Sequence, residues 1–148
     1  MWRVVHSKRA DASGLPEKDV FEGDTKIAEL CFDWHGGGKL RIGDSVFPIK
    51  GKGVSTRRFW LTDDAAREIA SLRVPPFTPT VLRVGDSEFK LKTKGWFGRQ
   101  HFELWQGDRM LGSVRFGKFC DVDLPPEVPL PVRVFIIWFE TAANFGSD

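Results

Sequence analysis

The feature that most constrains the fold of this chain is an internal repeat with a spacing of 42 residues. Residues 40–57 return as residues 82–99, and ten of the 18 aligned positions are identical. Composition alone would give about one identity over such a window. We therefore predict a duplication with two equivalent units, 40–73 and 82–115. The identical positions, numbered in the first unit, are Leu40, Arg41, Gly43, Asp44, Ser45, Phe47, Lys50, Lys52, Gly53 and Arg57.

Each unit has the pattern of short antiparallel strands. On either side of Gly-Asp-Ser at 43–45 and 85–87, large apolar residues alternate with polar ones, which is the period of a strand with one buried face. Gly-Asp-Ser itself suits a tight hairpin turn. Residues 67–73 have the propensity of a short helix, but the equivalent stretch in the second unit favours a strand, and the repeat extends that prediction to both. Further strands are expected near residues 2–5, 18–21, 26–32 and 118–124.

The C-terminal segment differs in character from the two units. Prolines at 125, 126, 129 and 131 precede an apolar run that ends before Gly146. Proline in the first turn and glycine just past the end are typical of a helix. We therefore expect a helix over residues 131–145, although the β-branched residues at its start would also suit a strand.

This helix is expected to form the core of the domain. Burial of its eight large apolar side chains would contribute a gross gain of about 12–24 kcal/mol. Its rise of about 21 Å is shorter than the ~30 Å hydrocarbon layer of a bilayer, so we expect no transmembrane segment. Arg133, Glu140, Thr141 and Asn144 form one narrow polar stripe, which should meet water or a polar lining at the mouth of the surrounding sheet.

Length and charge limit the classes of function. The 148 residues suffice for one domain, 1–148, with its own core. The formal net charge of +2, from 22 basic and 20 acidic residues, is too small to indicate a nucleic-acid partner, so any basic surface must be local. The N-terminus lacks the pattern of a signal peptide, which favours a cytoplasmic protein, with or without peripheral binding at the membrane. Cys31 and Cys120 lack metal-ligand spacing and are expected to be reduced, with a disulfide between them as the alternative.

About twelve short strands in two related halves, followed by an apolar helix, resemble the tubby C-terminal-like superfamily. This superfamily includes the tubby proteins, the phospholipid scramblases and the plant LURP-one-related proteins. The closest local likeness is Asp121-Val122-Asp123-Leu124, then prolines, then residues 132–140, which is similar to the scramblase order of acidic strand, short link and apolar helix. The resemblance implies a mainly β fold: a closed antiparallel barrel of about twelve strands, with an internal two-fold repeat, enclosing the hydrophobic C-terminal helix.

Basic residues recur at alternate positions of two equivalent predicted strands, so that on each strand they share one face. Charge-assisted hydrogen bonds to phosphate are strong, and a tryptophan beside lysines suits insertion at a membrane interface. This basic face therefore predicts binding of anionic phospholipid headgroups or phosphate groups. The alternative is an ordinary solvated outer face, with the tryptophan loop folded back on the core. The predicted ligand-binding residues are Lys50, Lys52, Arg57, Lys90, Lys92, Lys94, Trp96 and Arg99.

The sequence contains no motif for catalysis or for a cofactor. Gly36-Gly37-Gly38-Lys39 lacks the spacing of a phosphate-binding loop, and the three histidines have no metal-ligand spacing. Pro125 and Pro126 interrupt the acidic stretch that scramblases use to bind calcium. We therefore expect a non-enzymatic binding domain without metal or cofactor, whose partner is anionic membrane lipid. The alternative is a protein-interaction or structural scaffold domain with no ligand of its own.

Overall fold

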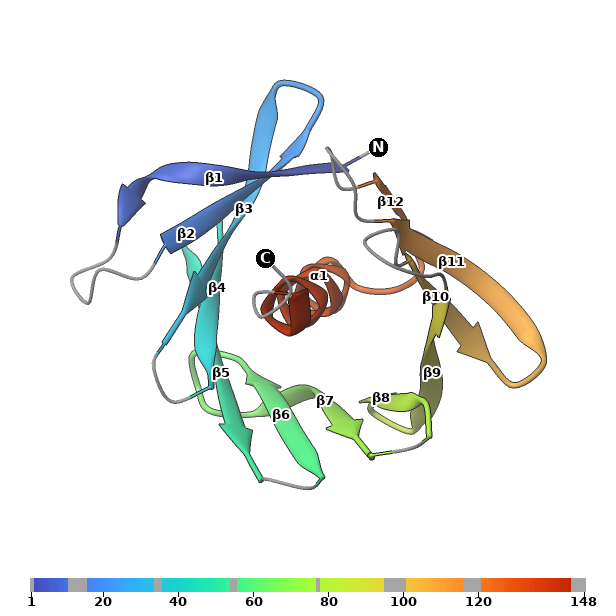
Figure 1. The fold of residues 1–148 in the computed structure, drawn as a ribbon. Coiled ribbons are helices and arrows are strands. Elements are labelled where there is room, and N and C mark those ends of the chain that lie inside the picture. The colour runs from blue at the N-terminus through green and yellow to red at the C-terminus, as the bar shows by residue number, and fades with distance from the viewer. Residues whose placement is uncertain are drawn as a thin grey trace.

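The computed structural model describes residues 2–10, 16–33, 36–53, 56–76, 78–94, 101–115 and 121–144. Twelve antiparallel strands follow one another around a single closed barrel, and one helix lies inside it (Figure 1). The predicted fold class is thereby confirmed. The strands are β1 (Trp2–Ala10), β2 (Pro16–Glu22), β3 (Thr25–Phe32), β4 (Gly38–Ile42), β5 (Ser45–Lys52), β6 (Arg57–Thr62), β7 (Glu68–Val74), β8 (Thr80–Val84), β9 (Ser87–Lys94), β10 (His101–Gln106), β11 (Arg109–Arg115) and β12 (Asp121–Asp123).

The two predicted units occupy β4–β7 and β8–β11, and their first two strands pair in the same way. Leu40 lies opposite Phe47 in the first unit, and Leu82 lies opposite Phe89 in the second. The third strand of the second unit is displaced by one residue relative to the repeat, because His101 pairs with Lys94 and Arg115 as Arg58 pairs with Lys52 and Arg73. The third and fourth strands of each unit also share a register shift next to their connecting turn. Residues 68–74, for which helix and strand were both considered, form a strand. The common origin of the two units stays a prediction from the sequence.

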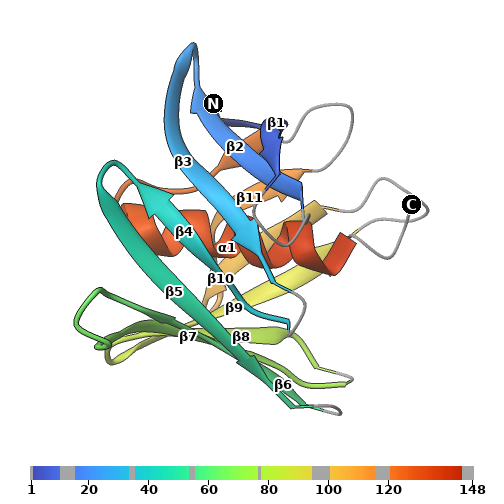
Figure 2. The ribbon, with the colours of Figure 1, turned by 90° about the vertical axis from the view of Figure 1, so that its left-hand side faces the viewer.

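Helix α1 (Leu130–Asn144) runs through the barrel interior, as both views show (Figures 1 and 2). It begins where the N–H groups of Val132 and Arg133 both donate to the carbonyl of Pro129, each at 3.0 Å. A segment surrounded by apolar side chains must satisfy its own backbone polar groups, because neither water nor a neighbouring strand is available. The β-branched run therefore forms a helix and not a thirteenth strand.

The core consists of this helix and the inward faces of the strands. On α1, Phe135, Ile136, Ile137 and Trp138 are at most 1% exposed. Several strands of the barrel wall each contribute one fully buried leucine to this core. Along each strand, this inward leucine alternates with outward polar residues. These leucines are Leu30, Leu40, Leu61, Leu72, Leu82 and Leu104.

Trp138 is the side chain that ties the helix to the wall. Its indole stacks on Phe32, with ring centroids 5.5 Å apart, and meets the edge of Phe59 at 5.7 Å. Its Nε1–H donates a hydrogen bond of 2.9 Å to the backbone carbonyl of Cys31. The apolar body and the polar tip of the indole are thus both accommodated within the barrel.

Two members of the polar stripe of α1, Glu140 and Thr141, do not meet water. Glu140 is fully buried, and this burial raises the pKa of its carboxyl well above the ordinary value of 4.5. Arg133 is half-buried over the ring of Trp2, and its Nε donates to the carbonyl of Val128 at 2.9 Å. The expectation that Glu140 meets water is wrong, because the barrel encloses this part of the helix. The side chain of Asn144 lies outside the described part.

No helix among the described residues is long and apolar enough to cross a membrane.

We expect Trp138→Ala to lower the free energy of unfolding by about 3–5 kcal/mol, because it removes a large buried side chain and leaves a cavity. Urea denaturation followed by circular dichroism measures this loss. The matched control is Trp105→Ala on the outer face, where the ring contacts Lys92, with an expected loss of about 1 kcal/mol or less. Equal losses at the two positions would contradict the assignment of Trp138 to the core.

Glu140 should make stability depend on pH. The folded protein favours the neutral carboxyl, whereas the unfolded chain ionises it above about pH 4.5. As the pH rises beyond that value, the wild type should lose up to about 1.4 kcal/mol per pH unit until the folded pKa is reached. In denaturation series between pH 4 and 8, Glu140→Gln should abolish this loss of stability with rising pH. The control Glu88→Gln changes an exposed carboxylate and should leave the loss intact. Parallel profiles of wild type and Glu140→Gln would contradict the prediction.

Candidate functional site

Three basic side chains lie directly opposite one another on the outer face of the barrel. Lys52 on β5 pairs with Arg58 on β6, and Arg58 pairs with Arg73 on β7. All three are exposed. Residues that face each other across antiparallel strands have Cβ atoms about 4.5–5.5 Å apart, and like charges there are destabilising. We call Lys52, Arg58 and Arg73 the cationic row.

A second row runs beside the first, two residues along each strand. It places Trp60 on β6 opposite Ser71 on β7, and Ser71 opposite Arg83 on β8. Arg83 is already paired with Glu88, whose carboxylate lies 3.0 Å from Nη2. This row therefore adds an aromatic ring, a hydroxyl and a neutralised arginine next to the cationic row.

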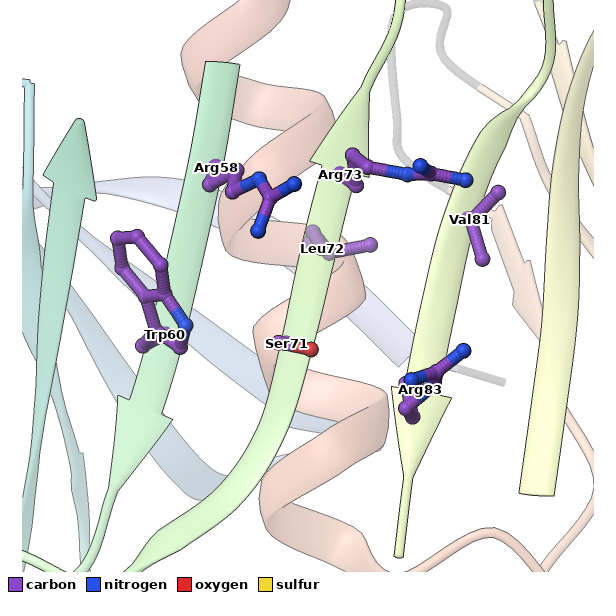
Figure 3. Close-up of a pocket in the computed structure, with 7 residues that line it drawn as sticks. All are labelled: Arg58, Trp60, Ser71, Leu72, Arg73, Val81 and Arg83. Carbon is purple, nitrogen blue, oxygen red and sulfur yellow. The ribbon is translucent and has the colours of Figure 1, made fainter. Parts of the chain in front are cut away.

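A shallow depression of about 170 Å³ lies where the two rows meet. Figure 3 shows Arg58 reaching from β6 towards β7, and Arg73 reaching from β7 towards Val81 on β8. Three arginines, of which Arg83 is already paired with Glu88, and one hydroxyl thus line the same small space. Guanidinium groups bind phosphate with two parallel hydrogen bonds, so this arrangement suits a phosphate group. The depression is lined by Arg58, Trp60, Ser71, Leu72, Arg73, Val81 and Arg83.

Three other arginines, Arg83 among them, have acidic partners. Arg41 lies 3.3 Å from Glu29, and Arg67 lies 3.1 Å from Asp63. The hydrogen bond from Lys26 also lowers the pKa of Glu29, so that this carboxylate is a stable partner. Within the described ranges, the cationic row has no ion pair. The cationic row therefore differs from these arginines, whose charge is neutralised by a neighbouring carboxylate.

The structure brings some of the predicted residues to this face. Lys50, Lys52 and Lys90 are exposed there, and Lys90 lies opposite Val81 of the depression. Lys92 is half-buried, and its ammonium group lies 4.3 Å from the centre of the Trp105 ring. Lys92 is thus engaged by a neighbour, whereas the other three point to solvent.

Other predicted residues are not brought to this face. Arg57 follows the opposite alternation to Arg58, and its guanidinium lies over the Phe59 ring at 5.1 Å, on the inward side of β6. The side chain of Lys94, and Trp96 and Arg99 entirely, lie outside the described part of the chain.

The sequence analysis missed Arg58, Trp60 and Arg73 as site residues. Its search followed the 42-residue spacing, at which Gln100 aligns with Arg58. In the structure the counterpart of Arg58 is His101, which pairs with Lys94 and Arg115. The sequence did contain one indication of this site: Arg58 and Trp60 stand two residues apart, so they lie on the same face of a strand. Arg58 lies opposite Lys52 and Trp60 lies opposite Lys50, and these pairs depend on the register of β5 and β6, which the sequence pattern did not specify.

Cys31 offers no reactive group beside this site. It is a free, buried cysteine whose Sγ donates to Glu17 Oε1 at 3.6 Å. Burial, followed by the nearby charge of Glu17, raises the pKa of its thiol to about 11, so the nucleophilic thiolate is scarce at neutral pH. Cys120 lies outside the described residues. Among those that are described, no three His, Cys, Asp or Glu side chains are grouped to hold a metal ion.

Comparison of the chain with protein-family models, with curated proteins and with solved structures finds no match. The resemblance to the tubby C-terminal-like superfamily therefore stays a prediction.

Repulsion within the cationic row should be measurable in the protein without any ligand. Arg73→Gln should raise the free energy of unfolding by about 0.2–1 kcal/mol at low ionic strength, because it removes a like charge opposite Arg58. The gain should vanish near 1 M NaCl, where screening acts over about 3 Å. Arg41→Gln, which removes an arginine with an acidic partner, should give no such gain. Destabilisation by Arg73→Gln at both salt concentrations would contradict the prediction.

Proposed function

We propose that this chain is a non-enzymatic binding domain that recognises anionic phospholipid headgroups through the outer face of β5–β9. The observation that carries the proposal is the cationic row, Lys52, Arg58 and Arg73, whose members face one another without an acidic partner in the described part. Such a row costs stability in the free protein. A bound phosphate group would turn the repulsion into attraction.

The filled interior directs binding to the outside of the barrel. Because α1 occupies the lumen, a carrier function of the kind seen in open barrels is not favoured. On the outer face, each basic residue near an anionic membrane contributes about 1 kcal/mol. The depression between Arg58 and Arg73 adds a place where one headgroup phosphate is held by hydrogen bonds as well as by charge.

The predicted resemblance points to the same class of ligand, because tubby domains bind phosphoinositide headgroups. On this proposal the protein is cytoplasmic and binds peripherally at the membrane surface. Lys50 and Lys90 flank the cationic row and add long-range attraction to it.

Vesicle flotation tests the proposal with a matched pair of variants. Arg73→Glu should weaken binding to vesicles that contain phosphatidylserine or a phosphoinositide by tenfold or more, since each unit of charge is worth about 1 kcal/mol. Arg115→Glu is the control, because Arg115 is exposed and stands 42 residues after Arg73, on β11. It should bind nearly as the wild type does.

Two further arms identify the source of the phosphate. If a soluble inositol phosphate competes with the vesicles, the headgroup alone suffices; if it does not, the membrane surface is required, and both results support the proposal. Equal binding of the wild type to neutral and anionic vesicles, or no binding to either, would overturn the proposal and favour a protein-interaction or scaffold role.

A further inference from the structure

A second and larger groove lies at the end of the barrel where α1 begins. It has a volume of about 510 Å³, within the range of pockets that bind small organic ligands. Its walls come from the β8–β9 turn, the β10–β11 turn and the link before α1. The groove is thus separate from the cationic row, which lies on the side of the barrel.

The floor of the groove is apolar. Met110 is 50% exposed, the highest value among the large hydrophobic residues that the structure describes as exposed. Phe89 and Leu111 lie beside it and pack against the main core. A ligand with an apolar side chain would therefore cover surface that is otherwise in contact with water.

Two opposite charges stand on the same groove without neutralising each other. Arg109 and Glu127 both line it, both are exposed, and neither forms an ion pair within the described ranges. The corresponding arginine of the first unit, Arg67, is bound by Asp63 at 3.1 Å. Opposite Arg109 the second unit has Gln106, which carries no charge. Arg109 is therefore left to bind another anion.

The wall that carries Glu127 is held in place before any ligand arrives. The N–H of Val128 donates to the carbonyl of Pro125 at 3.1 Å, and the carbonyl of Val128 accepts from Arg133 Nε at 2.9 Å. The Val128 side chain is buried. A preformed wall reduces the entropy that binding must overcome.

We infer that this groove binds a short apolar peptide with free termini. Its carboxylate pairs with Arg109, its ammonium group pairs with Glu127, and its apolar side chains lie on Met110 and Phe89. An anionic lipid headgroup fits less well, because Glu127 would repel it. A zwitterionic ligand with an apolar body matches all three properties of the groove.

Calorimetric titration with trileucine, N-acetyl-trileucine and trileucine amide tests this inference on the full chain. Trileucine should bind, and capping either end should weaken binding about tenfold or more, because each cap removes a hydrogen bond between charged groups. Arg109→Gln removes the partner of the peptide carboxylate, so this variant should bind trileucine and trileucine amide equally. Glu127→Gln removes the partner of the peptide ammonium group, so this variant should bind trileucine and N-acetyl-trileucine equally. Such selective losses would not follow from a general defect in folding.

Two controls complete the design. Arg67→Gln, at the equivalent position of the first unit, should bind trileucine as the wild type does. Arg73→Glu should also bind it normally, which separates this groove from the proposed lipid site. Absence of trileucine binding at about 10 mM, or equal binding of free and capped peptides to the wild type, would overturn the inference.

Discussion

A barrel of twelve strands encloses more space than its own inward side chains fill, since about eight strands already give an interior just wide enough for them. In this protein α1 occupies that space, and Trp138 joins it to the wall through Phe32, Phe59 and the carbonyl of Cys31. The strands cannot bury their leucines without the helix, and the helix cannot bury its apolar surface without the strands. Each part therefore depends on the other for its stability.

This mutual burial also determines where function lies. The helix fills the interior, so a ligand meets the outer face or the ends of the barrel. The two units share inward residues and much of their strand pairing, whereas some of their outward residues differ. The first unit carries the cationic row, which crosses β5–β7, and the second carries a groove in which Arg109 lacks the acidic neighbour of Arg67. The repeat preserves the wall, and each proposed site differs from its counterpart by single side chains, such as Arg58 in place of His101.

The sequence predicted the strands, the closed barrel and the helix well, because each follows from local periodicity, turn chemistry or the proposed resemblance. Side-chain positions that depend on pairing register were harder to predict. Arg58 and Arg73 lie opposite each other only in the observed register, and Arg57 points the other way because strand faces alternate. Glu140 was expected at water or at a polar lining of the barrel mouth, because a polar helix stripe usually marks an accessible surface, but the barrel buries it.

Hydrogen exchange of the backbone amides tests most directly whether the enclosed helix is the element on which this fold depends. If it is, the amides of residues 134–141 exchange only through global unfolding, with the same opening free energy as the most protected amides of β4–β6. If α1 merely rests in the barrel, its amides will exchange through a local opening whose free energy is about 2 kcal/mol or more below that of the strands. That second result would contradict the mutual dependence of helix and barrel wall.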